Sequence, residues 1–168
     1  MNYKSFYFTF GNIYNNSFPT FLMIFFAFLG YAEKSANLAL AISSTILFTQ
    51  IFSGNMRNII IASNDIILLN KVRQFRFLTS IIIFFISVLI FYLITKEINS
   101  LVISTIILII INWINEINIV EKELENEKNK ITIFLYINFS FSMFIIFLIY
   151  FKLIELIFLL LLFQSVFN

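Results

Sequence analysis

Residues 38–76 decide the fold: they read LALAISSTILFTQIFSG (38–54), NMRNIIIASND (55–65) and IILLNKVRQFR (66–76). The first part is an apolar run of helical length, and no proline separates it from the polar and basic part that follows. Such a run is typical of a helix at membrane depth, so residues 54–76 are expected to lie in water or among lipid headgroups. The stretch therefore predicts an integral membrane protein.

The composition of the whole chain supports the same prediction. Of the 168 residues, 61% are hydrophobic and only 12% are charged, which is far less polar than a soluble domain needs. The absence of Cys and His excludes a disulfide framework, a Cys or His metal site and histidine acid–base chemistry. The net charge of +2 is too small to indicate a nucleic-acid surface. We expect no cofactor, no metal and no nucleic-acid partner.

Six segments are long and apolar enough, or nearly so, for a spanning helix of about 20 residues. They are residues 6–29, 35–53, 77–95, 98–120, 131–151 and 153–167. Their apolar runs are continuous, which favours helices over the alternating strands of a barrel. The predicted fold is therefore all-α, a single polytopic transmembrane bundle of about six helices over residues 1–168. The last segment gives roughly 22 Å of helix, short of a hydrocarbon core of roughly 30 Å.

The distribution of lysine and arginine predicts the orientation. Of the 11 basic residues, eight fall on the side of the N-terminus, and three fall on the opposite side. The eight are Lys4, Arg57, Lys71, Arg73, Arg76, Lys122, Lys128 and Lys130, and the three are Lys34, Lys96 and Lys152. The positive-inside rule then predicts that both termini are cytoplasmic. Lys71, Arg73 and Arg76 are predicted to be topology anchors.

Polar residues recur along one face of the first segment, at Ser5, Thr9, Asn12, Asn16 and Thr20. Polar groups at membrane depth have to face protein or a water-filled cavity. One interpretation is a substrate-binding wall formed by Asn12 and Asn16, with Pro19 as a hinge. The alternative is that these groups only hydrogen-bond between packed helices.

Two charged residues are candidates for ligand contacts. Glu116 ends the fourth apolar segment, where it is either an ion or proton site at membrane depth or simply the start of the charged segment 121–130. Arg57 follows Gly54, where it can complement a helix C-terminus or bind a lipid phosphate through its planar fork. No paired-carboxylate motif appears, so we predict no catalytic residues and no enzyme.

The pattern FLGYAEKSANLALAISS (28–44), SGNMRNIII (53–61) and KVRQFRFLTSIII (71–83) resembles the beginning of a polysaccharide or lipid-linked oligosaccharide flippase. These proteins belong to the multidrug/oligosaccharidyl-lipid/polysaccharide (MOP) exporter superfamily. Gly30, Ala39, Ala41, Gly54 and Arg57 match the family layout of a loop, a small-residue second helix and an arginine one turn later. The chain departs from the family in its first external loop, which has Glu33, Lys34 and Ala36 instead of Pro and Gly.

The resemblance implies an N-terminal six-helix lobe of a transporter that normally has two such lobes. It implies translocation of a lipid-linked sugar across a bacterial inner membrane, with Arg57 near the phosphate and Asn12 and Asn16 near the headgroup. Glu116 is a further candidate substrate-binding residue. A chain of this kind would be a truncated or half-size protein among membrane lipids, and it would need a second six-helix lobe or a homo-oligomer. The alternative function is a non-transporting scaffold or partner subunit that docks a protein through segment 121–130.

Overall fold

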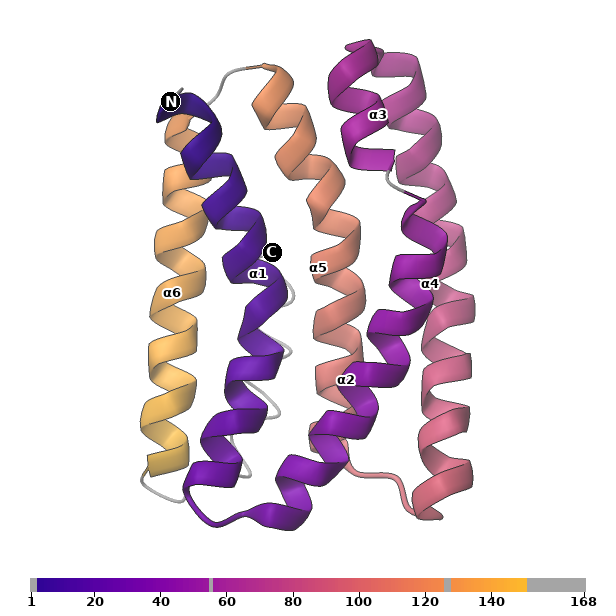
Figure 1. Cartoon of the computed structure of the whole chain (residues 1–168), viewed down its shortest axis with the longest axis vertical. Helices are drawn as coiled ribbons and strands as arrows, with labels where there is room; N and C mark the ends of the chain where they lie inside the picture. The colour runs from indigo at the N-terminus through magenta and orange to yellow at the C-terminus, as the bar shows by residue number, and fades with distance from the viewer. Residues whose placement is uncertain (1–2, 55, 126–127, 151–168) are drawn as a thin grey trace.

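The computed structural model describes residues 3–54, 56–125 and 128–150, without the side chains of residues 3–12, 15–16, 128, 130–131, 135 and 147–150. All of its regular structure in these residues is α-helical, which confirms the all-α prediction for this part of the chain. The helices are α1 (Tyr3–Phe28), α2 (Ala32–Ser53), α3 (Met56–Ser63), α4 (Ile66–Thr95), α5 (Ser100–Leu124) and α6 (Lys128–Tyr150). The long helices alternate in direction, and α3 lies at the same end as the N-terminus (Figure 1).

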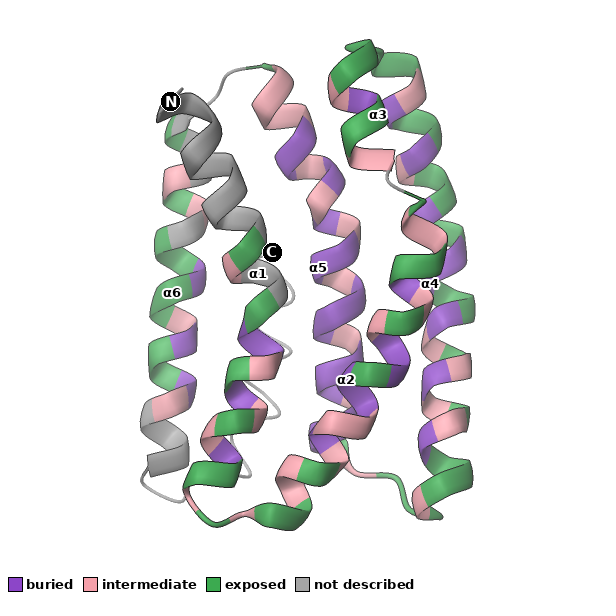
Figure 2. Ribbon diagram, in the orientation of Figure 1, coloured by how far each residue is buried: buried purple, intermediate pink, exposed green. Residues whose placement is uncertain are grey.

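Helix α5 is the centre of the bundle and packs against each of the other five helices described. Two apolar clusters, around the fully buried Leu108 and Ile106, lie beside each other along residues 101–113 of α5, and a third, around Ile117, follows toward the end of the helix. Figure 2 shows that α5 has the most continuous buried surface, whereas α4 and α6 are exposed along much of their length. Dense contacts around α5 supply the dispersion energy that holds the helices together.

Buried hydroxyl groups allow the helices to approach closely. Thr45 and Thr105 have no exposed surface, and each donates a hydrogen bond to the carbonyl one turn earlier, that of Ala41 and of Leu101. This pairing satisfies the polar groups inside their own helix, so the small side chains can lie in a helix–helix contact. In segment 35–53, Ala41, Ser44 and Thr45 are thus buried in helix–helix contacts.

Local sequence signals explain where the helices begin and end. The carboxylate of Asp65 accepts hydrogen bonds from the backbone N–H groups of Ile67 and Leu68 and caps the start of α4. Asn99 caps α5 in the same way. Gly54 adopts a left-handed conformation (φ +47°) and separates α2 from α3, a geometry that glycine adopts without the steric cost of a Cβ.

In the part of the chain that the structure describes, three helical segments are long and apolar enough to cross a membrane: Ala32–Ser63 (α2 with α3), Ile66–Thr95 and Ser100–Leu124. In the described residues, α1 and α6 contribute shorter apolar stretches, Ser17–Phe28 and Thr132–Ile146. Large apolar side chains on α4 point outward, with Phe77 62% and Phe85 66% exposed. Length, composition and this outward apolar surface are compatible with a membrane protein.

The predicted segments coincide with helices wherever the structure describes them. Segments 6–29, 35–53, 98–120 and 131–151 correspond to α1, α2, α5 and α6, with ends shifted by up to four residues. Segment 77–95 is only the later part of α4, which begins 11 residues earlier at Ile66. The sixth segment, 153–167, lies outside the described residues, so a six-helix count stays a prediction. Residues 54–76, expected as a polar break between spans, are themselves mostly helical as α3 and the first turns of α4.

Candidate functional site

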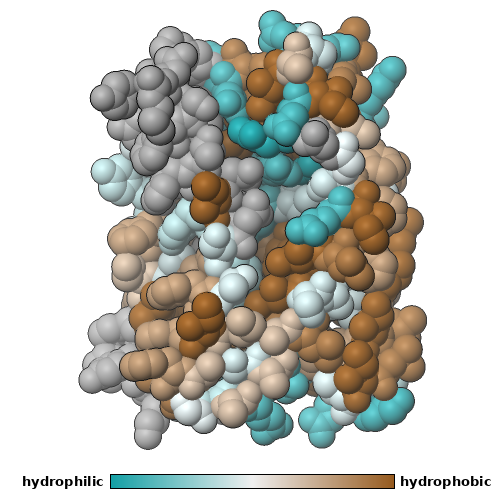
Figure 3. All heavy atoms as spheres, viewed as in Figure 1, coloured by the Kyte–Doolittle hydropathy of each residue, from teal (hydrophilic) through white to brown (hydrophobic). Residues whose placement is uncertain are grey.

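A polar cleft of about 380 Å³ lies between α1, α2 and α5. Helices α1 and α2 diverge from their connection toward the end at which α3 lies, and α5 closes the back of the space (Figure 1). Its polar lining consists of Thr49, Gln50, Ser53, Asn112 and Glu116. In the space-filling view, hydrophilic residues form a band down the middle of this face beside a large hydrophobic area (Figure 3). The cleft is therefore a polar feature in an otherwise apolar bundle.

The carboxylate at the cleft wall is paired with a buried arginine. Glu116 Oε2 on α5 lies 2.7 Å from Nη1 of Arg76 on α4. The Arg76 side chain is 1% exposed, whereas that of Glu116 is 17% exposed. Burying an isolated guanidinium is costly, and a carboxylate at this distance compensates much of that cost. Arg76 and Glu116 therefore act as one neutral unit behind the cleft.

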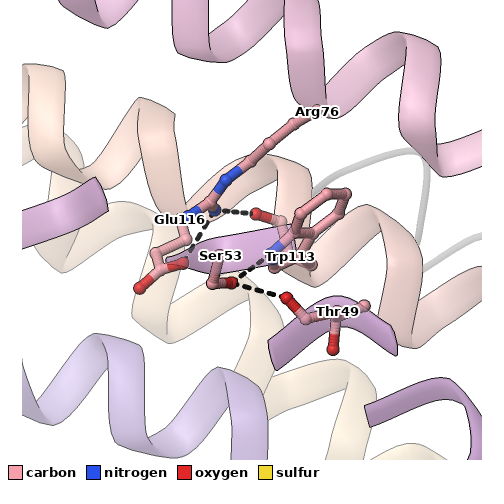
Figure 4. A network of polar contacts seen from close by, with 5 residues as sticks. All are labelled: Thr49, Ser53, Arg76, Trp113 and Glu116. Carbon is pink, nitrogen blue, oxygen red and sulfur yellow. Dashed lines mark hydrogen bonds and ion pairs between the residues drawn. The ribbon is translucent and has the colours of Figure 1, made fainter. Parts of the chain in front are cut away.

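Arg76 also holds Trp113, which lines the cleft, in place. Its Nη1 donates to the backbone carbonyl of Trp113, and its guanidinium lies over the Trp113 ring at 4.9 Å from the centroid. Figure 4 shows the guanidinium between the Glu116 carboxylate and this carbonyl. The stacking adds a cation–π attraction to the ion pair. The orientation of Trp113 is thus coupled to the position of α4.

A hydrogen-bond chain continues from Trp113 to α2 (Figure 4). The indole Nε1–H donates to Ser53 Oγ at 2.7 Å, and Ser53 Oγ donates to the carbonyl of Thr49 at 2.7 Å. The indole N–H, a donor that needs a partner when buried, is thereby satisfied. Glu116, Arg76, Trp113 and Ser53 consequently link α5, α4 and α2 through one polar network.

Two further ion pairs join the same helices near the end of the bundle. Arg57 of α3 pairs with Glu123 at 2.8 Å, and Arg73 of α4 pairs with Glu121 at 2.7 Å. Their side chains are 19–39% exposed, so water weakens these pairs more than the Arg76–Glu116 pair. Together with Arg76–Glu116 they form what we call the Arg–Glu ladder. It fastens α3 and the first turns of α4 to the last turns of α5.

The structure brings some of the predicted site residues together and separates others. Glu116 and Pro19 both line the cleft, and Pro19 is buried there. Arg57 belongs to the ladder instead, with Glu123 as its partner. The side chains of Asn12 and Asn16 lie outside the described residues. Their predicted ligand roles and the hinge role of Pro19 stay predictions.

The predicted topology anchors differ in their surroundings. Lys71 is exposed, and Arg73 is partly exposed in its pair with Glu121. Arg76 was expected at a headgroup surface, but its side chain is buried between α4 and α5. The pairing of Arg76 with Glu116 was missed because they lie 40 residues apart on different helices. The only available signal was that each is a charge next to an apolar run.

The described residues contain no group of three or more His, Cys, Asp or Glu side chains that could hold a metal ion. The oxygen atoms of the cleft belong mainly to amides and hydroxyls, with one carboxylate that is already neutralised by Arg76. Such a lining suits a ligand that forms hydrogen bonds and carries hydroxyl or amide groups.

Comparisons with known proteins give no relative for this chain: no protein-family model, no curated protein and no solved structure matches it. The resemblance to the flippases thus depends only on the residues quoted for it.

Proposed function

We propose that this chain is an integral membrane protein whose N-terminus and Arg–Glu ladder lie on the cytoplasmic side of a bacterial inner membrane. Support comes from the three helical segments long enough to span and from the apolar outer face of α4. Arg57 lies on α3, and Lys71, Arg73 and Arg76 lie in the first three turns of α4. Helix α3 and the start of α4 are at the same end of the bundle (Figure 1), which agrees with the positive-inside rule.

Within that setting, we propose a flippase-like transport function, in which the chain forms one lobe around the path of a lipid-linked sugar. The observation that carries the proposal is the polar cleft between α1, α2 and α5, because a bundle that only packs has no need of a space lined by polar side chains. The headgroup would occupy the cleft while its lipid tail stays in the bilayer, and opening would alternate between the two sides. The resemblance to MOP exporters is part of this proposal.

A cleft-filling variant tests the proposal. Ile46 lines the cleft on α2, so Ile46→Trp should obstruct it. Ile82→Trp on the exposed face of α4 adds the same bulk outside the cleft and is the matched control. The measurement is the rate at which a fluorescent polyprenyl-diphosphate sugar moves between the two leaflets of proteoliposomes. This rate should fall about tenfold for Ile46→Trp, a barrier change of about 1.4 kcal/mol. Equal rates in both variants would remove the cleft from the proposal, and no flipping by the unaltered protein would remove the transport function.

Arg57 needs a separate test because it already pairs with Glu123. If the arginine binds lipid phosphate, Arg57→Gln should slow flipping while Glu123→Gln, which frees Arg57 for phosphate, should not. Equal slowing by both variants would mean that the ion pair matters and that Arg57 has no phosphate role.

The second candidate function is a membrane scaffold, and the Arg–Glu ladder favours it. The ladder fixes α3, α4 and α5 to one another, as a docking platform requires, and Lys122 and Glu125 of the charged segment are not members of it. Replacing Lys122 and Glu125 with Ala keeps the ladder intact. Loss of a specific co-purifying protein in that variant, with flipping absent in the unaltered protein, would favour the scaffold over the transporter.

A further inference from the structure

One face of α2 points away from the bundle and borders the mouth of the cleft. It carries Ser43, Leu47, Gln50 and Ile51, which recur at helical spacing and are all exposed. Leu47 is 55% and Ile51 is 62% exposed. Gln50 also lines the cleft. We call these four residues the α2 face.

Gln50 lies within the apolar part of the bundle. Ser53 accepts a hydrogen bond from the Trp113 indole, and the Trp113 carbonyl accepts one from Arg76. The apolar run of α4 begins directly after Arg76. Gln50 is three residues before Ser53 on α2 and so lies about 4.5 Å further from the charged end. Among the described residues, no hydrogen bond is formed by its side-chain amide. Lipid chains offer no hydrogen-bonding group at this depth, so an amide facing them is costly.

We propose that the α2 face packs against the α2 face of a second copy of this chain, around a twofold axis close to Gln50. An amide is both donor and acceptor, so two glutamines related by a twofold axis satisfy each other. Leu47 and Ile51 bury apolar surface on either side, and the small Ser43 allows close approach, since its hydroxyl already donates to the carbonyl of Leu40.

The charges near the cleft permit this contact. A free carboxylate in each copy would repel its counterpart at an isologous interface. Glu116 is paired with Arg76, however, so each copy presents a neutral cleft wall. The two clefts can then face each other, and each is completed on its open side by the partner copy.

Other occupants fit the α2 face less well. Residues 156–163, LIFLLLLF, are apolar and have no side-chain group to pair with Gln50. A lipid chain has none either. Gln164 and Ser165 follow residues 156–163, and if either residue occupied the α2 face within one chain, Leu47→Cys would not link two copies. A different protein is the remaining occupant, and the experiment below distinguishes it from a second copy by mass. The inference requires the membrane placement proposed above, but it does not require that the chain transports anything.

Cysteine crosslinking tests the proposal cleanly because the natural chain contains no Cys. Leu47→Cys keeps Gln50 intact and places a thiol near the proposed axis. Mild oxidation of native membranes should link two copies of the 19.8 kDa chain through this residue. Ile82→Cys on the exposed face of α4 is the matched control and should stay monomeric.

A second comparison tests the role of Gln50. Adding Gln50→Leu to Leu47→Cys should weaken dimerisation about tenfold, judged from the linked fraction against protein density in vesicles. Gln74→Leu, an exposed glutamine on α4, should leave the linked fraction unchanged. Failure of Leu47→Cys to link, equal linking at Ile82→Cys, or an adduct with the mass of a different protein would each overturn the proposal. Because crosslinking needs no substrate, a dimer without flipping would reject the transport function alone, and flipping by an unlinked monomer would reject this inference alone.

Discussion

Arg76 on α4 and Glu116 on α5 form a 2.7 Å ion pair in which the arginine side chain is 1% exposed. The pair lies where the charged end of the bundle meets its apolar part, and it connects the cleft wall to the Arg–Glu ladder. A buried charge is tolerated only with its partner, because breaking such a pair costs much more than replacing it as a whole. Two predictions about stability follow from this asymmetry.

Glu116→Gln should destabilise the protein by about 3–5 kcal/mol, because the substitution leaves the buried guanidinium of Arg76 without a countercharge. Glu121→Gln removes a partner of the more exposed Arg73 and should cost about 0–1 kcal/mol. Both stability losses can be measured as changes in the free energy of unfolding, by titrating the protein in mixed micelles with a denaturing detergent. Equal losses in the two variants would contradict the burial of Arg76.

Replacing both members of the pair should restore most of that loss. Arg76→Met combined with Glu116→Leu fills a similar volume without charge, so we expect its stability to lie within about 1–2 kcal/mol of the natural protein. The same detergent titration applies. A double variant as unstable as Glu116→Gln would show that hydrogen bonds from Arg76, such as the one to the Trp113 carbonyl, contribute more than the ion pair.

Ser53→Ala should shift the fluorescence of the single tryptophan to shorter wavelength. The indole N–H of Trp113 donates to Ser53 Oγ at 2.7 Å, and loss of this acceptor removes a hydrogen bond that stabilises the excited state. The buried donor left behind should cost about 1–3 kcal/mol of stability. Ser63→Ala on the exposed end of α3 is the control and should change neither property. An unchanged spectrum for Ser53→Ala would mean that Trp113 has another acceptor.

Pro19→Ala should rigidify α1. Proline lacks the N–H that would bond to the carbonyl of residue 15, and a proline inside a helix costs about 3 kcal/mol. Alanine restores that donor, so hydrogen exchange should slow for the amides around residue 19. Ala27→Gly on an exposed position of the same helix should accelerate exchange near its own site only. Unchanged exchange around residue 19 would argue against the predicted hinge.

The sequence was sufficient for the helices and insufficient for their contacts. Long apolar runs such as 77–95 and 98–120 predict helices directly, because hydrophobic length is a property of one segment. The pairs Arg57–Glu123, Arg73–Glu121 and Arg76–Glu116 join residues 66, 48 and 40 positions apart. Such pairing depends on how each helix is rotated about its axis, which the periodicity of a single helix does not determine when nearly every position is apolar.

The same limit applies to the cleft. Glu116 and Pro19 were selected separately, one as an acid near a span and the other as a helix breaker, and the structure places both in the lining of one cleft. Gln50 and Ser53 of segment 35–53 line the same cleft. Their place at the cleft follows from the divergence of α1 and α2, which is a property of the assembled bundle (Figure 1).

The Arg–Glu ladder has a consequence for the order of events during biogenesis. In the folded bundle, the charges of Arg57, Arg73 and Arg76 are cancelled by glutamates of α5. Those glutamates are synthesised later than the arginines they neutralise, so the nascent chain presents three uncompensated positive charges until α5 emerges from the ribosome. In the proposed orientation, the insertion machinery would therefore encounter a segment with three more uncompensated positive charges than the folded bundle presents there.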